Sequence, residues 1–144
     1  MISSSPPELQ HYQARFVTKE AIALLLNLKK EEIYRIDCWR YVIHVVGKGI
    51  STFVSYADLP PILGVEAPTP KDFNYWRKRW QHNQNQAPNF WVEFYAQKFR
   101  TVSTLREMYT WGELVSVIKS VIPNSAVQWL RNLYAQEKQA IDNF

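Results

Sequence analysis

Residues 17–63, VTKEAIALLLNLKKEEIYRIDCWRYVIHVVGKGISTFVSYADLPPIL, contain the periodic patterns that decide the fold. Thr18 offers an N-cap before residues 19–26, where apolar side chains recur at helical spacing. Asn27 follows, and asparagine tolerates the left-handed conformation in which many helices end. The stretch therefore predicts a short helix followed by a tight turn.

A second helix is predicted over residues 30–37. Ile33 and Ile36 are three positions apart, a spacing that places both on one buried face of a helix. The opposite face would then be exposed and would combine basic and aromatic side chains. Its members are Lys29, Lys30, Tyr34 and Arg35, together with the acidic Glu31.

Two β-rich runs follow the second predicted helix, WRYVIHVV at 39–46 and ISTFVSY at 50–56. The residues between them, Gly47-Lys48-Gly49, suit a tight hairpin tip because glycine adopts positive φ without strain. A hairpin of this kind would present Lys48 at its tip and Arg40 and His44 on its first strand. It is either a surface that contacts a ligand or a plain structural hairpin.

The flanking segments suggest how the chain is divided. Residues 1–14 contain a serine run and the Pro6-Pro7 pair, which predicts a flexible tail. Residues 15–66 would form one small domain, and residues 67–144 a helical region. The proline-containing stretch 64–70 would be the boundary between them.

The net charge of +4 is concentrated in the middle of the chain. Residues 71–100 hold six Lys or Arg and two Asp or Glu, whereas the remaining charges balance. A predicted helix over residues 71–82 combines the basic residues Arg77, Lys78 and Arg79 with an aromatic stripe. The aromatic residues Phe73, Trp76 and Trp80 either pack in a core or stack on bases of a single strand.

Further helices are predicted to start at two capping boxes. Thr110 with Glu113, and Ser125 with Gln128, both have the required spacing. The last helix has a wide apolar face, which could close the core of the same chain or join two copies. Residues assigned to such a dimer contact are Val127, Leu130, Leu133 and Tyr134.

Composition argues for an intracellular protein without catalytic activity. The single Cys38 excludes an intramolecular disulfide, and the sequence contains neither a signal peptide nor an apolar run long enough to span a membrane. His11, His44 and His82 have no spacing to carboxylates that a metal site or catalytic triad would need. We therefore expect a cytoplasmic location, no metal and no cofactor, and no small-molecule ligand is evident from the sequence.

Several short motifs in residues 17–63 resemble the winged helix-turn-helix of the MerR and excisionase group. They are Val17-Thr18-Lys19-Glu20-Ala21, Leu25-Leu26-Asn27-Leu28, Ile33-Tyr34-Arg35, Gly47-Lys48-Gly49 and Tyr56-Ala57-Asp58-Leu59. The resemblance implies a mainly α fold with a small β-hairpin wing, in which the second helix enters the major groove. In size the chain is similar to the small repressors of type V-K CRISPR-associated transposons, which belong to this group.

The resemblance makes double-stranded DNA the expected partner. It implies a homodimeric, sequence-specific transcriptional regulator, most simply a repressor that binds a palindromic operator. The residues expected to contact DNA are Lys29, Lys30, Tyr34, Arg35, Arg40, His44, Lys48, Arg77, Lys78 and Arg79. Two alternatives remain open: a recombination directionality factor that bends DNA, and a protein-interaction module.

Overall fold

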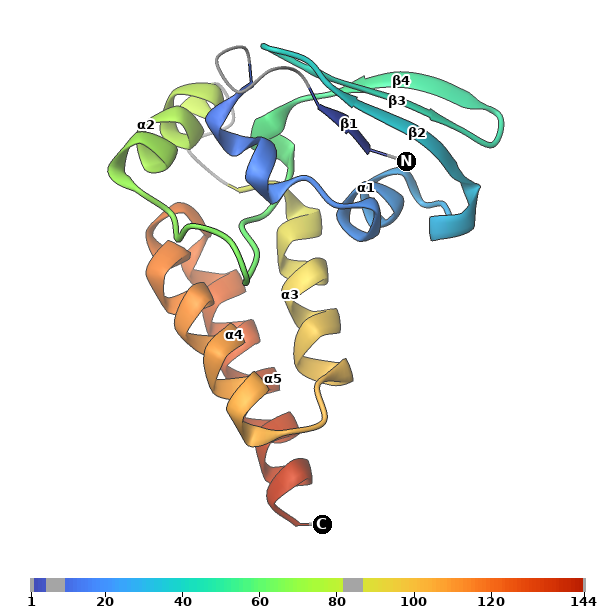
Figure 1. Ribbon diagram of the computed structural model, residues 1–144. Helices are drawn as coiled ribbons and strands as arrows, with labels where there is room; N and C mark the ends of the chain where they lie inside the picture. Colours follow the sequence, from blue (N-terminus) through green and yellow to red (C-terminus); the bar gives the residue numbers. More distant parts are fainter. Residues whose placement is uncertain (1, 5–9, 82–86, 144) are drawn as a thin grey trace. The chain divides into compact units, whose positions relative to one another are not determined.

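The computed structural model describes residues 2–4, 10–81 and 87–143 (Figure 1). Helices predominate over strands, so the prediction of a mainly α chain with a small β component is confirmed. The chain forms two compact units that divide between Pro60 and Pro61. This division precedes the expected stretch 64–70, since the hydroxyl of Tyr95 donates to the carbonyl oxygen of Pro61 at 2.7 Å and ties it to the helical unit.

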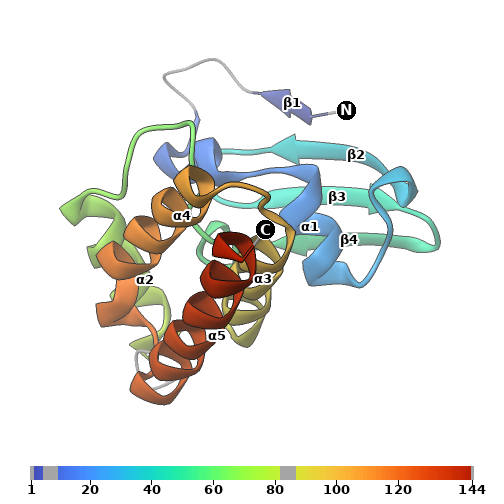
Figure 2. The ribbon, with the colours of Figure 1, turned by 90° about the horizontal axis from the view of Figure 1, so that it is seen from below.

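The first unit is built on a four-stranded sheet with the order β1-β2-β3-β4 (Figure 2). Strand β1 pairs in parallel with β2, and the pairs β2–β3 and β3–β4 are antiparallel. Helix α1 covers one face of the sheet, and no described element of this unit covers the other face over β2–β4 (Figure 1). The strands are β1 Ile2–Ser4, β2 Ile33–Cys38, β3 Ile43–Gly47 and β4 Ile50–Val54.

The helix predicted over residues 30–37 is wrong. A single 3-10 turn, Lys30–Glu32, leads directly into strand β2. The pairing register shifts between Ile33 and Arg35, which marks a β-bulge. Because a bulge adds one residue to a strand, Ile33 and Ile36 share the buried face despite their odd separation. A strand therefore occupies the place of the second helix of a helix-turn-helix.

Helix α1 spans Lys19–Leu26, as predicted from the sequence. The hydroxyl of Thr18 caps it by accepting a hydrogen bond from the backbone N–H of Ala21 at 3.1 Å. Asn27 ends it in the left-handed conformation, with φ 57° and ψ 45°. The fully buried Ile22 lies on the face of α1 that packs against the sheet.

The strands β3 and β4 are joined by the two residues Lys48 and Gly49, so the predicted hairpin tip is confirmed. Gly49 has φ 72°, a conformation that side chains with a Cβ rarely adopt. A second tight hairpin joins β2 to β3. The backbone N–H of Trp39 closes it by donating to the carbonyl of Val42 at 3.0 Å.

The stretch 1–14, predicted to be a flexible tail, contains secondary structure where the structure describes it. Ile2–Ser4 forms strand β1, and a 3-10 helix covers Tyr12–Phe16. Phe16 is fully buried and forms part of the core of the first unit. Apolar burial thus anchors the 3-10 helix at Phe16, while residues 5–9 lie outside the described part of the chain.

The second unit is helical and encloses a core rich in tryptophan. The ring of Trp91 meets those of Trp76 and Trp80 edge to face, with centroid distances of 5.3 and 4.9 Å. All three are buried, so the aromatic stripe is core and does not present Trp76 or Trp80 to bases. The helices are α2 Pro70–Arg79, α3 Asn89–Thr101, α4 Leu105–Ile118 and α5 Asn124–Asp142.

Both helix starts predicted from capping boxes are displaced. Helix α4 begins six residues earlier than expected, because Thr104 accepts from the backbone N–H of Glu107 at 3.2 Å. This Thr-x-x-Glu pair has the same spacing as the pair that begins at Thr110, which lies inside the helix. Helix α5 begins at Asn124, so Ser125 is already helical. Among the described residues, no helix has the length and apolar character needed to cross a membrane.

Candidate nucleic-acid interface

The open face of strands β2–β4 carries a cluster of exposed aromatic rings. Side chains alternate along each strand, and the pairing places His44 opposite Phe53 on this face. The Trp39 ring stacks on His44 at a centroid distance of 5.4 Å, and the Phe53 ring lies 5.1 Å from that of His44. Trp39 is 45% exposed and Phe53 60% exposed, so both present ring surface to the solvent.

A polar network adjoins the aromatic rings on the same face. The Nε of Arg35 donates to the carboxylate of Asp37, at 3.0 Å from Oδ1 and 2.9 Å from Oδ2. Asp37 is only 6% exposed, and a carboxylate this buried needs such a cationic partner. His44 bridges the network, with Nδ1 3.9 Å from Asp37 Oδ2 and Nε2 3.0 Å from the hydroxyl of Ser51.

This network holds the Arg35 side chain in place as far as Nε, because Nε is the atom that donates to Asp37. The side chain of Arg35 nevertheless remains 66% exposed. The remaining guanidinium N–H groups can therefore donate to a ligand that lies on the sheet. The arrangement combines flat apolar rings with a positioned cation.

The other predicted contact residues of the first unit surround this face at its two ends. Arg40 lies in the turn between β2 and β3, beside Tyr41, over whose ring its guanidinium carbon is placed at 5.3 Å. Lys48 lies at the opposite turn. Lys29 is exposed just before the 3-10 turn, Lys30 is exposed within it, and Tyr34 is 56% exposed at the bulge. The structure thus brings Arg35 and His44 together on the face and places the remaining residues near its ends.

Lys48 is partly neutralised by a neighbouring acid. Its Nζ lies 3.6 Å from Glu32 Oε2. The pKa of Glu32 is lowered, first because its carboxylate accepts a hydrogen bond from the backbone N–H of Lys29 at 2.8 Å, and also because Lys48 is close. The carboxylate is therefore charged at neutral pH, and it ties the hairpin tip to the preceding 3-10 turn.

The predicted basic residues of the second unit lie on helix α2. Arg77, Lys78 and Arg79 are all exposed in the last turn of α2. The guanidinium carbon of Arg77 lies 5.6 Å from the centroid of the Phe73 ring, which holds the side chain against the helix. The positive charges of these three side chains interact favourably with the negative C-terminal end of the helix dipole. The side chains can also bind an external anion.

The residues assigned to a dimer contact face the interior of the second unit. Leu130 and Leu133 of α5 are buried, so they close the core of the same chain. Val127 and Tyr134 are half-buried and line a cavity between α4 and α5. Of the four side chains, none is an exposed apolar residue of the kind that forms the centre of an interface.

Sequence reasoning missed Trp39, Phe53 and Asp37 as members of a surface site. The signal was present in ISTFVSY, where inward residues alternate at Thr52, Val54 and Tyr56 and leave Phe53 on the outer face. The cluster of exposed rings is informative, because contiguous apolar patches on a surface mark interaction sites, whereas single exposed apolar residues are common.

Among the described residues, no group of three or more histidines, cysteines and carboxylates is placed to hold a metal ion. Comparisons with protein-family models, with curated proteins and with solved structures found no match.

Proposed function

We propose that this chain binds nucleic acid through the open face of strands β2–β4, and that its preferred ligand is single-stranded. The observation that carries the proposal is the pair of exposed rings, Trp39 and Phe53, beside the positioned guanidinium of Arg35. Every base has a flat π face, and stacking on an aromatic side chain is worth about 1–3 kcal/mol per base. Bases inside a duplex are already stacked and cannot use these rings.

The charges near the face supply the contacts to the backbone of the ligand. Arg35 is linked through Asp37 to His44, on which Trp39 stacks, and Arg40 directly follows Trp39 in the chain. A nucleic-acid strand that crosses the sheet toward Lys48 would meet a third cation. The exposed Arg77, Lys78 and Arg79 of the second unit add to the attraction of a polyanion at long range. These roles predict strong salt dependence, because each neutralised phosphate releases counterions.

A comparison of labelled oligothymidylate with a duplex of the same length tests the proposal. We expect tighter binding of the single strand at low salt, measured by fluorescence anisotropy. Arg40→Ala should flatten the slope of log affinity against log salt by about 0.7, the value for one phosphate contact on a single strand. Absence of any binding at low salt would refute nucleic-acid binding, and equal or tighter binding of the duplex would refute the preference.

Duplex DNA is the second candidate ligand, and the observation that favours it is the positioned Arg35. Side chains of a sheet can enter the major groove, where an arginine donates to both acceptors of guanine. In this version the protein is a transcriptional regulator, most simply a homodimeric repressor in the cytoplasm that reads a palindrome with its sheet and has no catalytic role. Arg35→Ala would then cost about 1–3 kcal/mol on the cognate site only.

The two regulatory roles expected from the sequence differ in what they do to the duplex. A repressor would occupy one palindrome as a dimer, which a gel-shift series against upstream DNA combined with sedimentation would detect. A recombination directionality factor would bind tandem sites cooperatively and bend them. A sheet face that binds a protein instead would show a partner in nuclease-treated pull-downs, lost on Phe53→Ala.

A further inference from the structure

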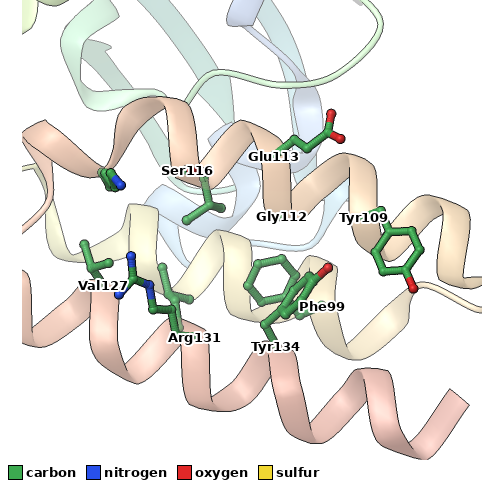
Figure 3. Close-up of a pocket in the computed structure, with 11 residues that line it drawn as sticks. Phe99, Tyr109, Gly112, Glu113, Ser116, Val127, Arg131 and Tyr134 are labelled. Atoms are coloured by element: carbon green, nitrogen blue, oxygen red, sulfur yellow. The ribbon is translucent and has the colours of Figure 1, made fainter. Parts of the chain in front are cut away.

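A cavity of about 400 Å³ lies between helices α4 and α5, with Phe99 of α3 at its floor (Figure 3). This volume is in the range of sites that hold small organic molecules, about 300–1,000 Å³. The floor and walls are mainly apolar. Phe99 and Leu130 are almost fully buried, and Val115 lies beside them.

The shape of the cavity depends on a close contact between the two helices. The ring of Tyr134 lies directly on Gly112, where an added Cβ would come within 2.6 Å of Tyr134 Cε2. Glycine inside a helix costs about 1 kcal/mol relative to alanine, so this position has a packing reason for its glycine. The Tyr134 ring forms one wall of the cavity, and its edge meets Phe99 at a centroid distance of 5.4 Å.

The polar rim of the cavity carries two cations. Lys119 at the end of α4 and Arg131 of α5 both line it, and neither has an ion-pair partner among the described residues. Figure 3 shows the Arg131 side chain extending from α5 toward α4. Glu113 is the acidic residue of the rim, and its carboxylate points away from α5 in this view.

We propose that this cavity binds a small organic anion with an aromatic or branched aliphatic body, the apolar part resting on Phe99, Leu130 and Tyr134. The anionic group, a carboxylate or sulfonate, is held by Arg131 and Lys119 at the rim. Charge-assisted hydrogen bonds from a guanidinium to such a group are about twice as strong as neutral ones. The site belongs to the helical unit and is independent of nucleic-acid binding by the sheet.

Two fluorescent probes that differ in charge test this site. The first is the aromatic sulfonate 8-anilinonaphthalene-1-sulfonate, and the second is the neutral N-phenyl-1-naphthylamine, which lacks the sulfonate. We expect one saturable site for the sulfonate on the folded full chain. Arg131→Gln should weaken the sulfonate about tenfold, the loss of one charge-assisted bond, and leave the neutral probe nearly unchanged.

A second variant tests the location of the probe without relying on charge. Ser116→Trp projects an indole into the cavity from an exposed helix position and should abolish binding of both probes. Trp129→Ala, an exposed residue of α5 outside the cavity lining, is the matched control and should change neither affinity. The circular dichroism spectrum and the thermal midpoint establish that each variant is folded.

Three results would overturn the site. They are an absence of saturable binding by the wild-type chain, an equal loss of both probes on Arg131→Gln, and retention of the sulfonate by folded Ser116→Trp. If Ser116→Trp does not fold, Val127→Phe fills the cavity from α5 and is read in the same way.

Discussion

Replacement of Tyr95 by phenylalanine should destabilise the helical unit by about 1–2 kcal/mol. The Tyr95 side chain is fully buried, and its hydroxyl donates to the carbonyl of Pro61, itself buried, at 2.7 Å. Phenylalanine has the same ring and creates almost no change in apolar burial. The cost is therefore the lost hydrogen bond together with the unpaired carbonyl of Pro61.

Urea unfolding followed by circular dichroism and by tryptophan fluorescence measures this loss, and two probes are needed because the two units can unfold separately. Tyr41→Phe is the matched control: Tyr41 is 75% exposed, so its hydroxyl is solvated in both states and the change should stay within about 0.5 kcal/mol. A Tyr95→Phe variant as stable as the control would refute the reasoning.

The pH dependence of the same pair gives a further check. Burial raises the pKa of Tyr95 well above its usual value of 10.0. The unfolded chain therefore loses this proton at a lower pH than the folded chain does, and the wild type loses stability as the pH rises above about 10. Tyr95→Phe lacks this group, so its stability should fall less steeply over that window.

Three further predictions follow from the first unit. Burial raises the pKa of Cys38, which is 3% exposed, so Ellman's reagent should label it slowly in the native state and fully in urea. Asn27→Ala should cost about 1–2 kcal/mol in thermal unfolding and Asn27→Gly little, because the position is left-handed with φ 57°. Gly47→Ala should cost about 1–3 kcal/mol, since its Cβ would lie 2.7 Å from the backbone oxygen of Glu32; a variant of wild-type stability would contradict that contact.

Local signals in the sequence predicted several elements correctly. The cap at Thr18, the left-handed Asn27 and the two-residue tip at Lys48 and Gly49 depend on near neighbours in the chain, and all three lie where expected. Of the two roles considered for the aromatic stripe of α2, packing in a core holds for Trp76 and Trp80. Such local features can be predicted without knowing which residues far apart in the sequence are in contact.

The strand β2 could not be predicted from the same kind of pattern. The spacing of Ile33 and Ile36 fits a helix, and the charged residues between Lys29 and Arg35 do not oppose one. The bulge that produces this spacing exists only because β2 pairs with β3. The pairing between strands therefore determined the structure of this segment. Arg35, which was expected on the surface of a helix, lies on the face of a sheet.

The candidate site was predicted only in part, because its geometry depends on the same pairing of strands. Arg35 and His44 were named from the sequence and lie on one face, but the expected geometry was a groove-binding helix beside a wing. The partners that give the face its character, Trp39, Phe53 and Asp37, come together only through the register of three strands. The dimer contact stays a prediction: Leu130 and Leu133 are buried within the chain, and the sequence of an apolar helix face does not tell whether its own chain or a second copy covers it.

The affinity of oligothymidylate for a Trp39→Ala, Phe53→Ala double variant tests the central claim most directly. Loss of two stacking rings should weaken binding by at least about tenfold at constant salt, while Trp129→Ala, an equally exposed tryptophan at 47%, should bind as the wild type does. A folded double variant with wild-type affinity, or an equal loss in the control, would contradict the assignment of the open sheet face as the nucleic-acid interface.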